Sequence, residues 1–186
     1  MIKGDFSMIR AVKFKLKNGK TITIRPLRLA DYDAQESYIK KFSKGPGAIQ
    51  TLQYPGRPRP PKEYFQKFLA NNFLLGAFDG DTIIGTCSVN LLRHDHPYSG
   101  HAAGMGMSVL QKYTHNGIGG KFFEIGEKWA RENGVHKLQA EIRHNNIPSI
   151  ANCIKHGFII TGINYDAAFI NGKWVHEYIV EKVLDK

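Results

Sequence analysis

The chain has 186 residues, of which 42% are apolar and 23% charged, a composition typical of one folded soluble domain and unlike a disordered tail. No apolar run reaches the roughly 18 residues that a membrane-spanning helix needs. The first ten residues also lack the apolar stretch of a signal peptide. Cys87 and Cys153 lie inside apolar or helical patterns, which excludes a disulfide framework. The sequence therefore predicts a cytoplasmic protein with no membrane partner.

The net charge of +10 is concentrated near the start of the chain. Residues 1–93 hold 16 Lys and Arg against 7 Asp and Glu, whereas residues 94–186 hold 10 against 9. A basic surface is typical of proteins that bind nucleic acid or acidic partners. Lysines also occur on solvated strand edges, where they oppose aggregation. We favour the solvated edge, and the nucleic-acid alternative stays open.

The first predicted element is a β-hairpin. Apolar residues alternate with lysines over residues 12–17, and apolar residues alternate again over residues 21–25. Asn18 and Gly19 stand between the two runs, which predicts a type I′ turn because that turn needs two residues with positive φ. The alternation places the lysines on one face of the hairpin.

The remaining elements give an α/β (α+β) sandwich with a mixed sheet. A helix is expected to open at residues 29–31 and to reach about Phe42. The carboxylate of Asp31 or Asp33 can accept hydrogen bonds from its first N–H groups. The long proline-rich loop over residues 43–62 is more typical of function than of a simple connection. The later predicted elements are a helix at 63–72, strands at 73–78, 82–92 and 101–110, a helix at 117–133, a strand at 137–143, a helix at 147–156, and strands at 158–168 and 173–184. We predict one domain over residues 1–186, with residues 1–20 as a basic extension that includes the first hairpin strand.

A glycine-rich turn joins the strand at 101–110 to the helix at 117–133. Its sequence is Thr114-His-Asn-Gly117-Ile-Gly119-Gly120. Glycines at the start of a helix let unpaired N–H groups approach an anion, and the helix dipole favours a phosphate there. The pattern is neither a P-loop nor a dinucleotide fingerprint. A purely structural turn between a strand and a helix is the alternative.

This turn resembles the acetyl-CoA motif Arg/Gln-x-x-Gly-x-Gly/Ala of the GNAT (GCN5-related) N-acetyltransferase superfamily, with Thr114 departing at the first position. Further on, Asn146-Ile-Pro-Ser149 and Lys155-His-Gly-Phe158 resemble the family's second signature, in the expected order. The resemblance covers residues 20–184. It is closest in pattern to acetyltransferases that act on ribosomal proteins or on small-molecule amines.

The resemblance implies a GNAT fold, with a central mixed, mostly antiparallel sheet flanked by helices and an N-terminal β-hairpin. It also implies an acyltransferase that moves acetyl from acetyl-CoA to a primary amine of a small molecule or a protein N-terminus by direct attack, with no metal. The residues that it implies as acetyl-CoA contacts are Met107, Ser108, Val109, Thr114, His115, Asn116, Gly117, Ile118, Gly119, Gly120, Asn146, Ser149 and Lys155.

Two residues match positions that supply a base and an acid in some family members, namely Glu141 and Cys153. Glu141 alternatively pairs with Arg143 on a solvated strand face. Cys153 alternatively is an inert core residue, because burial suppresses thiol reactivity. Asn146 is alternatively only the N-cap of its helix.

The acceptor pocket is less clearly marked by the sequence. We expect Tyr54, His101 and Glu177 to contribute to it. His94 and His96 lack the spacing of a zinc site and are interpreted as solvated loop residues. Two other functions stay open: a catalytically silent protein that binds acetyl-CoA, and a nucleic-acid or acidic-partner binder that uses the basic hairpin. A homodimer is also open.

Overall fold

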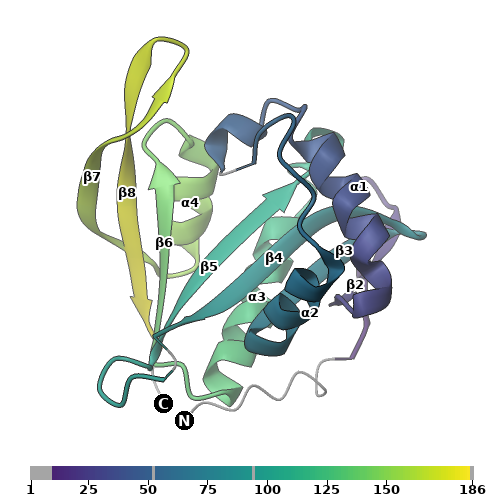
Figure 1. Cartoon of the computed structure of the whole chain (residues 1–186), viewed down its shortest axis with the longest axis horizontal. Helices are drawn as coiled ribbons and strands as arrows, with labels where there is room; N and C mark the ends of the chain where they lie inside the picture. Colours follow the sequence, from purple (N-terminus) through teal and green to yellow (C-terminus); the bar gives the residue numbers. More distant parts are fainter. Residues whose placement is uncertain (1–9, 52, 94, 185–186) are drawn as a thin grey trace.

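The computed structural model describes residues 10–51, 53–93 and 95–184. The described residues form one eight-stranded sheet with the strand order β1-β2-β3-β4-β5-β6-β8-β7 (Figure 1). The strands are β1 Val12–Lys15, β2 Thr21–Pro26, β3 Asn72–Asp79, β4 Thr82–Leu92, β5 Ala102–Val109, β6 Lys137–Arg143, β7 Ile159–Ile170 and β8 Lys173–Val183. Neighbouring strands are antiparallel, with the exception of β5 and β6, which are parallel. The predicted mixed, mostly antiparallel sheet is confirmed.

Helices cover both faces of this sheet. They are α1 Tyr32–Phe42, α2 Lys62–Asn71, α3 Ile118–Glu132 and α4 Ile147–Lys155, with short 3-10 turns at Leu29–Asp31, Ala48–Gln50 and Gln111–Tyr113. One buried cluster joins α1 and α2 to the sheet through Tyr38, Phe65 and Leu74. The larger cluster lies on the opposite face, where Trp129 of α3 and Cys153 of α4 pack against the strands. The sheet therefore separates an α1/α2 side from an α3/α4 side.

The N-terminal hairpin forms as predicted, but its turn differs from the predicted type. Lys15 pairs with Thr21, so residues 16–20 form the connection, which is longer than a two-residue turn. The N–H of Gly19 donates to the carbonyl oxygen of Leu16 at 2.9 Å, and the N–H of Leu16 donates to the carbonyl oxygen of Lys20 at 2.8 Å. Gly19 has φ of +88° while Asn18 does not have positive φ. A type I′ turn needs two such residues, so that prediction is wrong. The exposed Lys13 and Lys15 lie on the predicted common face.

The start of α1 also differs in detail from the prediction. The Asp31 side chain makes no cap hydrogen bond to α1. Its carboxylate instead binds the guanidinium of Arg25 at 2.7 Å through both oxygens and accepts the N–H of Arg28 at 2.8 Å. These bonds hold the pKa of Asp31 below its usual range against the opposing effect of burial.

None of the helices in the described part of the chain is long and apolar enough to cross a membrane. Both cysteines are buried and free. The 43–62 loop crosses the sheet from α1 to α2 and contains the 3-10 turn at Ala48–Gln50. The loop lies close to β6, because the carbonyl oxygen of Ile49 accepts a hydrogen bond from Arg143.

Candidate active site

The two central parallel strands separate partway along their length. β5 and β6 pair only through Ala102–Lys137, Ala103–Leu138 and Gly104–Gln139. Beyond Gly104 they diverge, as Figure 1 shows for the two arrows that leave a common end of the sheet. The edge of β5 that faces β6 therefore has no strand partner after Gly104, and its backbone N–H and C=O groups are available to a ligand.

A cavity of about 730 Å³ occupies this region. Its wall includes Met105, Met107, Phe123 and Cys153 from the α3/α4 side of the sheet. The wall also includes residues of α1, α2 and the 43–62 loop from the opposite side. The cavity therefore passes between the separated strands and connects the two faces of the sheet.

Two glycines leave space in the wall of this cavity. Gly104 and Gly106 alternate with Met105 and Met107 along β5, as the sequence predicted. A Cβ atom at Gly104 would meet only Leu92 at 3.8 Å, and one at Gly106 only Ser88 at 3.8 Å. Protein packing therefore does not require glycine at either position, and the space belongs to the cavity.

The predicted anion-binding turn lies where β5 leads into α3. Gly117 is the N-cap of α3 with φ of +88°, a conformation that favours glycine. His115 also has positive φ, at +61°. The first hydrogen bond into the helix runs from the N–H of Lys121 to the carbonyl oxygen of Gly117 at 3.1 Å. The N–H groups of residues 115–120 have no acceptor within the described ranges, so they form a row of donors at the positive end of a helix.

The side chains of this turn hold it in place. Asn116 accepts the N–H of Asn18 at 3.3 Å and donates to the carbonyl oxygen of Thr114 at 3.1 Å. Thr114 donates both its hydroxyl and its N–H to the carbonyl oxygen of Gln111, at 2.8 and 3.2 Å. Neither donor of Thr114 is free for a ligand, so its assignment as a cofactor contact stays a prediction. The hydrogen bond between Asn18 and Asn116 fixes the β1–β2 hairpin beside the anion-binding turn.

Asn146, Ser149 and Cys153 also line the cavity, from the start and middle of α4. Asn146 accepts the N–H groups of Ser149 and Ile150 with its backbone carbonyl at 3.1 Å. Asn146 is the N-cap residue of α4, as predicted, although its side chain makes no cap hydrogen bond. Lys155 lies at the end of α4 and outside the cavity wall.

Glu141 lies on β6, beyond the point where that strand leaves β5, and lines the cavity. Its carboxylate is exposed and has no ion pair within the described part of the chain. The alternative that Glu141 pairs with Arg143 is wrong, because Arg143 pairs with Glu177. Cys153 lies across the strand separation, and burial raises the pKa of its thiol to about 11.

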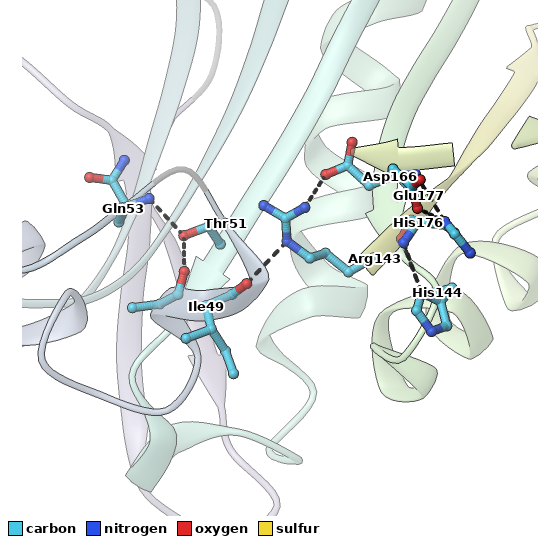
Figure 2. A network of polar contacts seen from close by, with 9 residues as sticks. Ile49, Thr51, Gln53, Arg143, His144, Asp166, His176 and Glu177 are labelled. Atoms are coloured by element: carbon cyan, nitrogen blue, oxygen red, sulfur yellow. Dashed lines mark hydrogen bonds and ion pairs between the residues drawn. The ribbon is translucent and has the colours of Figure 1, made fainter. Parts of the chain in front are cut away.

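Arg143 connects three segments at the rim of the cavity (Figure 2). Its guanidinium lies 2.8 Å from a carboxylate oxygen of Glu177 on β8, and its Nε donates to the carbonyl oxygen of Ile49 at 3.1 Å. The Arg143 side chain is 8% exposed and that of Glu177 is 15% exposed. Behind this pair, the ring Nδ1 of His176 accepts the backbone N–H of Asp166 at 2.9 Å. The backbone N–H of His176 donates to the ring Nδ1 of His144 at 3.2 Å. Arg143 therefore holds the 43–62 loop against β6 and β8.

The structure brings only some of the predicted acceptor residues to the cavity. Glu177 lines it, whereas Tyr54 and His101 do not. Tyr54 is 55% exposed, and the His101 ring meets the His136 ring edge to face at the end where β5 and β6 still pair. Of the histidines considered as ligands, His94 lies outside the described residues. No cluster of three or more metal-ligating side chains occurs within residues 10–51, 53–93 and 95–184.

Solved structures with the same arrangement include several acetyltransferases. An acetyltransferase of the GNAT family from Streptococcus pneumoniae has a TM-score of 0.79 and 22% identity, with 88% of this chain and 99% of that chain covered. A ribosomal-protein-alanine N-acetyltransferase from Brucella melitensis has a TM-score of 0.71 and 23% identity, with 87% and 99% covered. A phosphinothricin acetyltransferase from Sinorhizobium meliloti, solved in complex with acetyl-CoA, has a TM-score of 0.73 and 17% identity, with 88% of each chain covered. These likenesses show the fold.

A comparison with curated protein sequences found no significant match. The model of the acetyltransferase (GNAT) family matches residues 44–158, which is more than half of the chain. The chain belongs to the GNAT family. This match confirms the resemblance seen in the two sequence motifs. GNAT proteins are acyltransferases that use acetyl-CoA.

The geometry of this GNAT chain fits acetyl-CoA. The row of free N–H groups at residues 115–120 suits a pyrophosphate. The unpaired edge of β5 offers alternating donors and acceptors to an extended amide chain. The space beside Gly104 and Gly106 lies between these backbone groups and the α1/α2 side of the cavity.

Several residues of the cavity wall in this GNAT chain were not predicted from the sequence. Gln35 and Glu36 of α1 and Asn90 of β4 were not singled out. Gln35 stands on the buried face of an amphipathic helix, and a buried amide at such a position is the signal that could have identified it. Arg143 was considered only as a partner for Glu141.

Proposed function

We propose that this chain transfers an acetyl group from acetyl-CoA to a primary amine that enters the cavity from the α1/α2 side. The observation that carries the proposal is the cavity between β5 and β6, which connects that side to the α3/α4 side. Two substrates that approach from opposite faces of a sheet can meet in such a passage. Positioning two substrates in this way supplies much of a transfer rate.

Backbone groups would hold acetyl-CoA, which supplies the acetyl group as a thioester. The N–H groups of residues 115–120 would bind its pyrophosphate. The unpaired edge of β5 after Gly104 would bind its pantetheine arm, and one free N–H of that edge would stabilise negative charge on the acetyl oxygen.

Glu141 is the proposed base. A free alkylammonium group has a pKa near 10.4, so the incoming amine must lose a proton before it attacks. The Glu141 carboxylate lies in the cavity wall and has no cation partner within the described residues. It would attract the ammonium group and accept its proton directly or through water.

Cys153 supports a direct attack by the amine. Because its thiol pKa is raised to about 11 by burial, it stays protonated at neutral pH and is a poor nucleophile. We infer that no acetyl group is carried on Cys153. As a neutral thiol it could donate a proton to the departing CoA thiolate. Water is the alternative proton donor.

The test combines binding and turnover. Calorimetric titration with acetyl-CoA should give saturable binding, and release of free CoA thiol should be measured over a panel of primary amines. Glu141→Gln should lower kcat about 10²-fold or more without changing the Kd for acetyl-CoA.

Glu132→Gln is the matched control, because Glu132 lies at the far end of α3 in an exposed pair with Lys128. Wild-type turnover in Glu141→Gln would remove Glu141 as the base. Binding of acetyl-CoA without turnover of any amine would favour the catalytically silent alternative.

A further inference from the structure

The cavity wall holds three glutamates and two arginines, an excess of one negative charge, although the protein carries a net charge of +10. The charged residues in the cavity wall are Glu36, Glu141, Glu177, Arg57 and Arg143. Arg143 is bound to Glu177 at 2.8 Å, and Arg57 donates to the side-chain oxygen of Gln53 at 2.7 Å. Glu36 and Glu141 are left without an ion pair within the described ranges.

Glu36 is the more enclosed of these two carboxylates. It is half-buried on α1, and burial raises its pKa while the charges of Arg59 and Arg57 oppose that change. Neither arginine forms an ion pair with Glu36 in the described residues: Arg59 pairs with Asp33, and Arg57 donates to the side-chain oxygen of Gln53. A desolvated carboxylate in a cavity wall without a bound cation is poorly stabilised by the protein alone.

Amide oxygens in the same wall also lack partners. The side-chain oxygens of Gln35, Gln50 and Asn90 are buried and accept no hydrogen bond from the described residues. All three residues line the cavity, and Gln35 is only 8% exposed. Buried carbonyl oxygens in folded proteins almost always have a donor. All three oxygens lack a hydrogen-bond donor. A ligand rich in N–H groups would supply these donors.

An apolar strip completes the wall between these polar groups. Ile39 of α1, Phe65 and Phe68 of α2 and Leu74 of β3 face the cavity. Glu36 lies beside this strip on α1, whereas Glu141 lies on the opposite wall on β6. The wall thus offers two separate carboxylates with apolar side chains that suit a short alkyl chain.

We propose that the acceptor is an aliphatic diamine or longer polyamine, with one amine presented at Glu141 for acetylation and a second ammonium group held by Glu36 and the amide oxygen of Gln35. This inference rests on the proposed acetyl transfer and names its substrate class. The second ammonium group supplies N–H donors to the amide oxygens and a cation in direct contact with Glu36, which no arginine of the described residues provides. A monoamine of the same length leaves Glu36 and Gln35 without their partners.

The test compares diamines with monoamines of matched length. At saturating acetyl-CoA, kcat/KM is measured for diaminoalkanes with three to six methylene groups and for the corresponding alkylamines. The best diamine should exceed its matched monoamine by at least tenfold in kcat/KM, mainly through a lower KM. Because a diamine has two equivalent ends, its kcat/KM exceeds that of the monoamine by a factor of about two on statistical grounds alone. Equal values after that correction would overturn the inference.

Two variants assign the preference to the proposed residues. Glu36→Gln and Gln35→Leu should each lower the ratio of diamine to monoamine kcat/KM by at least fivefold. Glu63→Gln, on the exposed first turn of α2 outside the cavity wall, is the matched control and should keep the ratio. A ratio that is unchanged in both cavity variants would overturn the assignment.

A binding measurement separates this inference from the proposed function. Calorimetric titration of the protein with diaminopentane in the presence of CoA needs no turnover. Binding that weakens at least fivefold in Glu36→Gln, with no amine acetylated, would support the diamine site and refute the transfer reaction. Acetylation of monoamines and diamines at equal rates would support the transfer reaction and refute the diamine site. Failure of diaminopentane to bind would also refute the site.

Discussion

Replacing Arg143 by methionine removes the guanidinium group that holds the 43–62 loop to the far half of the sheet. The pair between Arg143 and Glu177 is short, at 2.8 Å, and both side chains are largely buried, at 8% and 15% exposure. Removing one partner of a buried ion pair costs about 3–5 kcal/mol, because the other charge remains buried without compensation. The variant also leaves the carbonyl oxygen of Ile49 without its donor.

The expected loss of about 3–5 kcal/mol is therefore a large part of a typical unfolding free energy of about 5–15 kcal/mol. For a chain of this length it corresponds to a fall in Tm of roughly 6–20 °C. Urea unfolding followed by tryptophan fluorescence measures the change at constant temperature. The KM for the amine should also rise, because the loop that carries Gln50 and Gln53 of the cavity wall loses its anchor.

A double-mutant cycle isolates the contribution of the pair. Combining Arg143→Met with Glu177→Leu should recover most of the lost stability, since an apolar pair can replace a buried ion pair at little cost. Lys128→Met is the control, because its 3.8 Å pair with Glu132 is exposed and should contribute less than about 0.5 kcal/mol. The reasoning is refuted if Arg143→Met unfolds within about 1 kcal/mol of wild type, or if the double variant is no more stable than the single one.

Two further predictions concern the anion-binding turn and the buried thiol. Gly117→Asp should raise the Kd for CoA at least 100-fold in calorimetric titration, because it places a carboxylate beside the free N–H groups of residues 115–120. Gly134→Asp is the matched control: Gly134 also has positive φ, at +72°, and lies in open space, so its Kd should not change, and equal losses in both variants would contradict the phosphate site. For Cys153, the folded pKa of about 11 lies above the unfolded value of about 8.5, so the unfolded chain loses its proton first and stability falls as pH rises through this interval. Cys153→Ala should reduce that fall in urea unfolding between pH 8.5 and 11, and an identical pH dependence would contradict the assignment.

The sequence was sufficient to predict the order of the elements. Three patterns are local, because each involves only residues that are close in the sequence and needs no tertiary contact. They are the alternation over β1 and β2, the apolar stripe of α3 and the glycines within 117–120. The position of the glycine-rich turn before α3 is predictable in the same way, because the strand end, the glycines and the helix start are adjacent in the chain. Its binding of an anion stays a prediction. The turn type at Asn18-Gly19 was wrong, because the connection includes three more residues than the dipeptide suggested.

Contacts between distant segments were decided only by the tertiary structure. Arg143 binds Glu177, 34 residues away, and the carbonyl oxygen of Ile49, 94 residues away, although its neighbour Glu141 was the partner suggested by sequence. Glu36 and Glu141 likewise face one cavity from α1 and β6. Periodicity identifies the face of an element that is buried, but it does not identify the residue that packs opposite. The separation of β5 from β6, which creates the cavity, depends on how the two halves of the sheet pack together, and no local pattern encodes it.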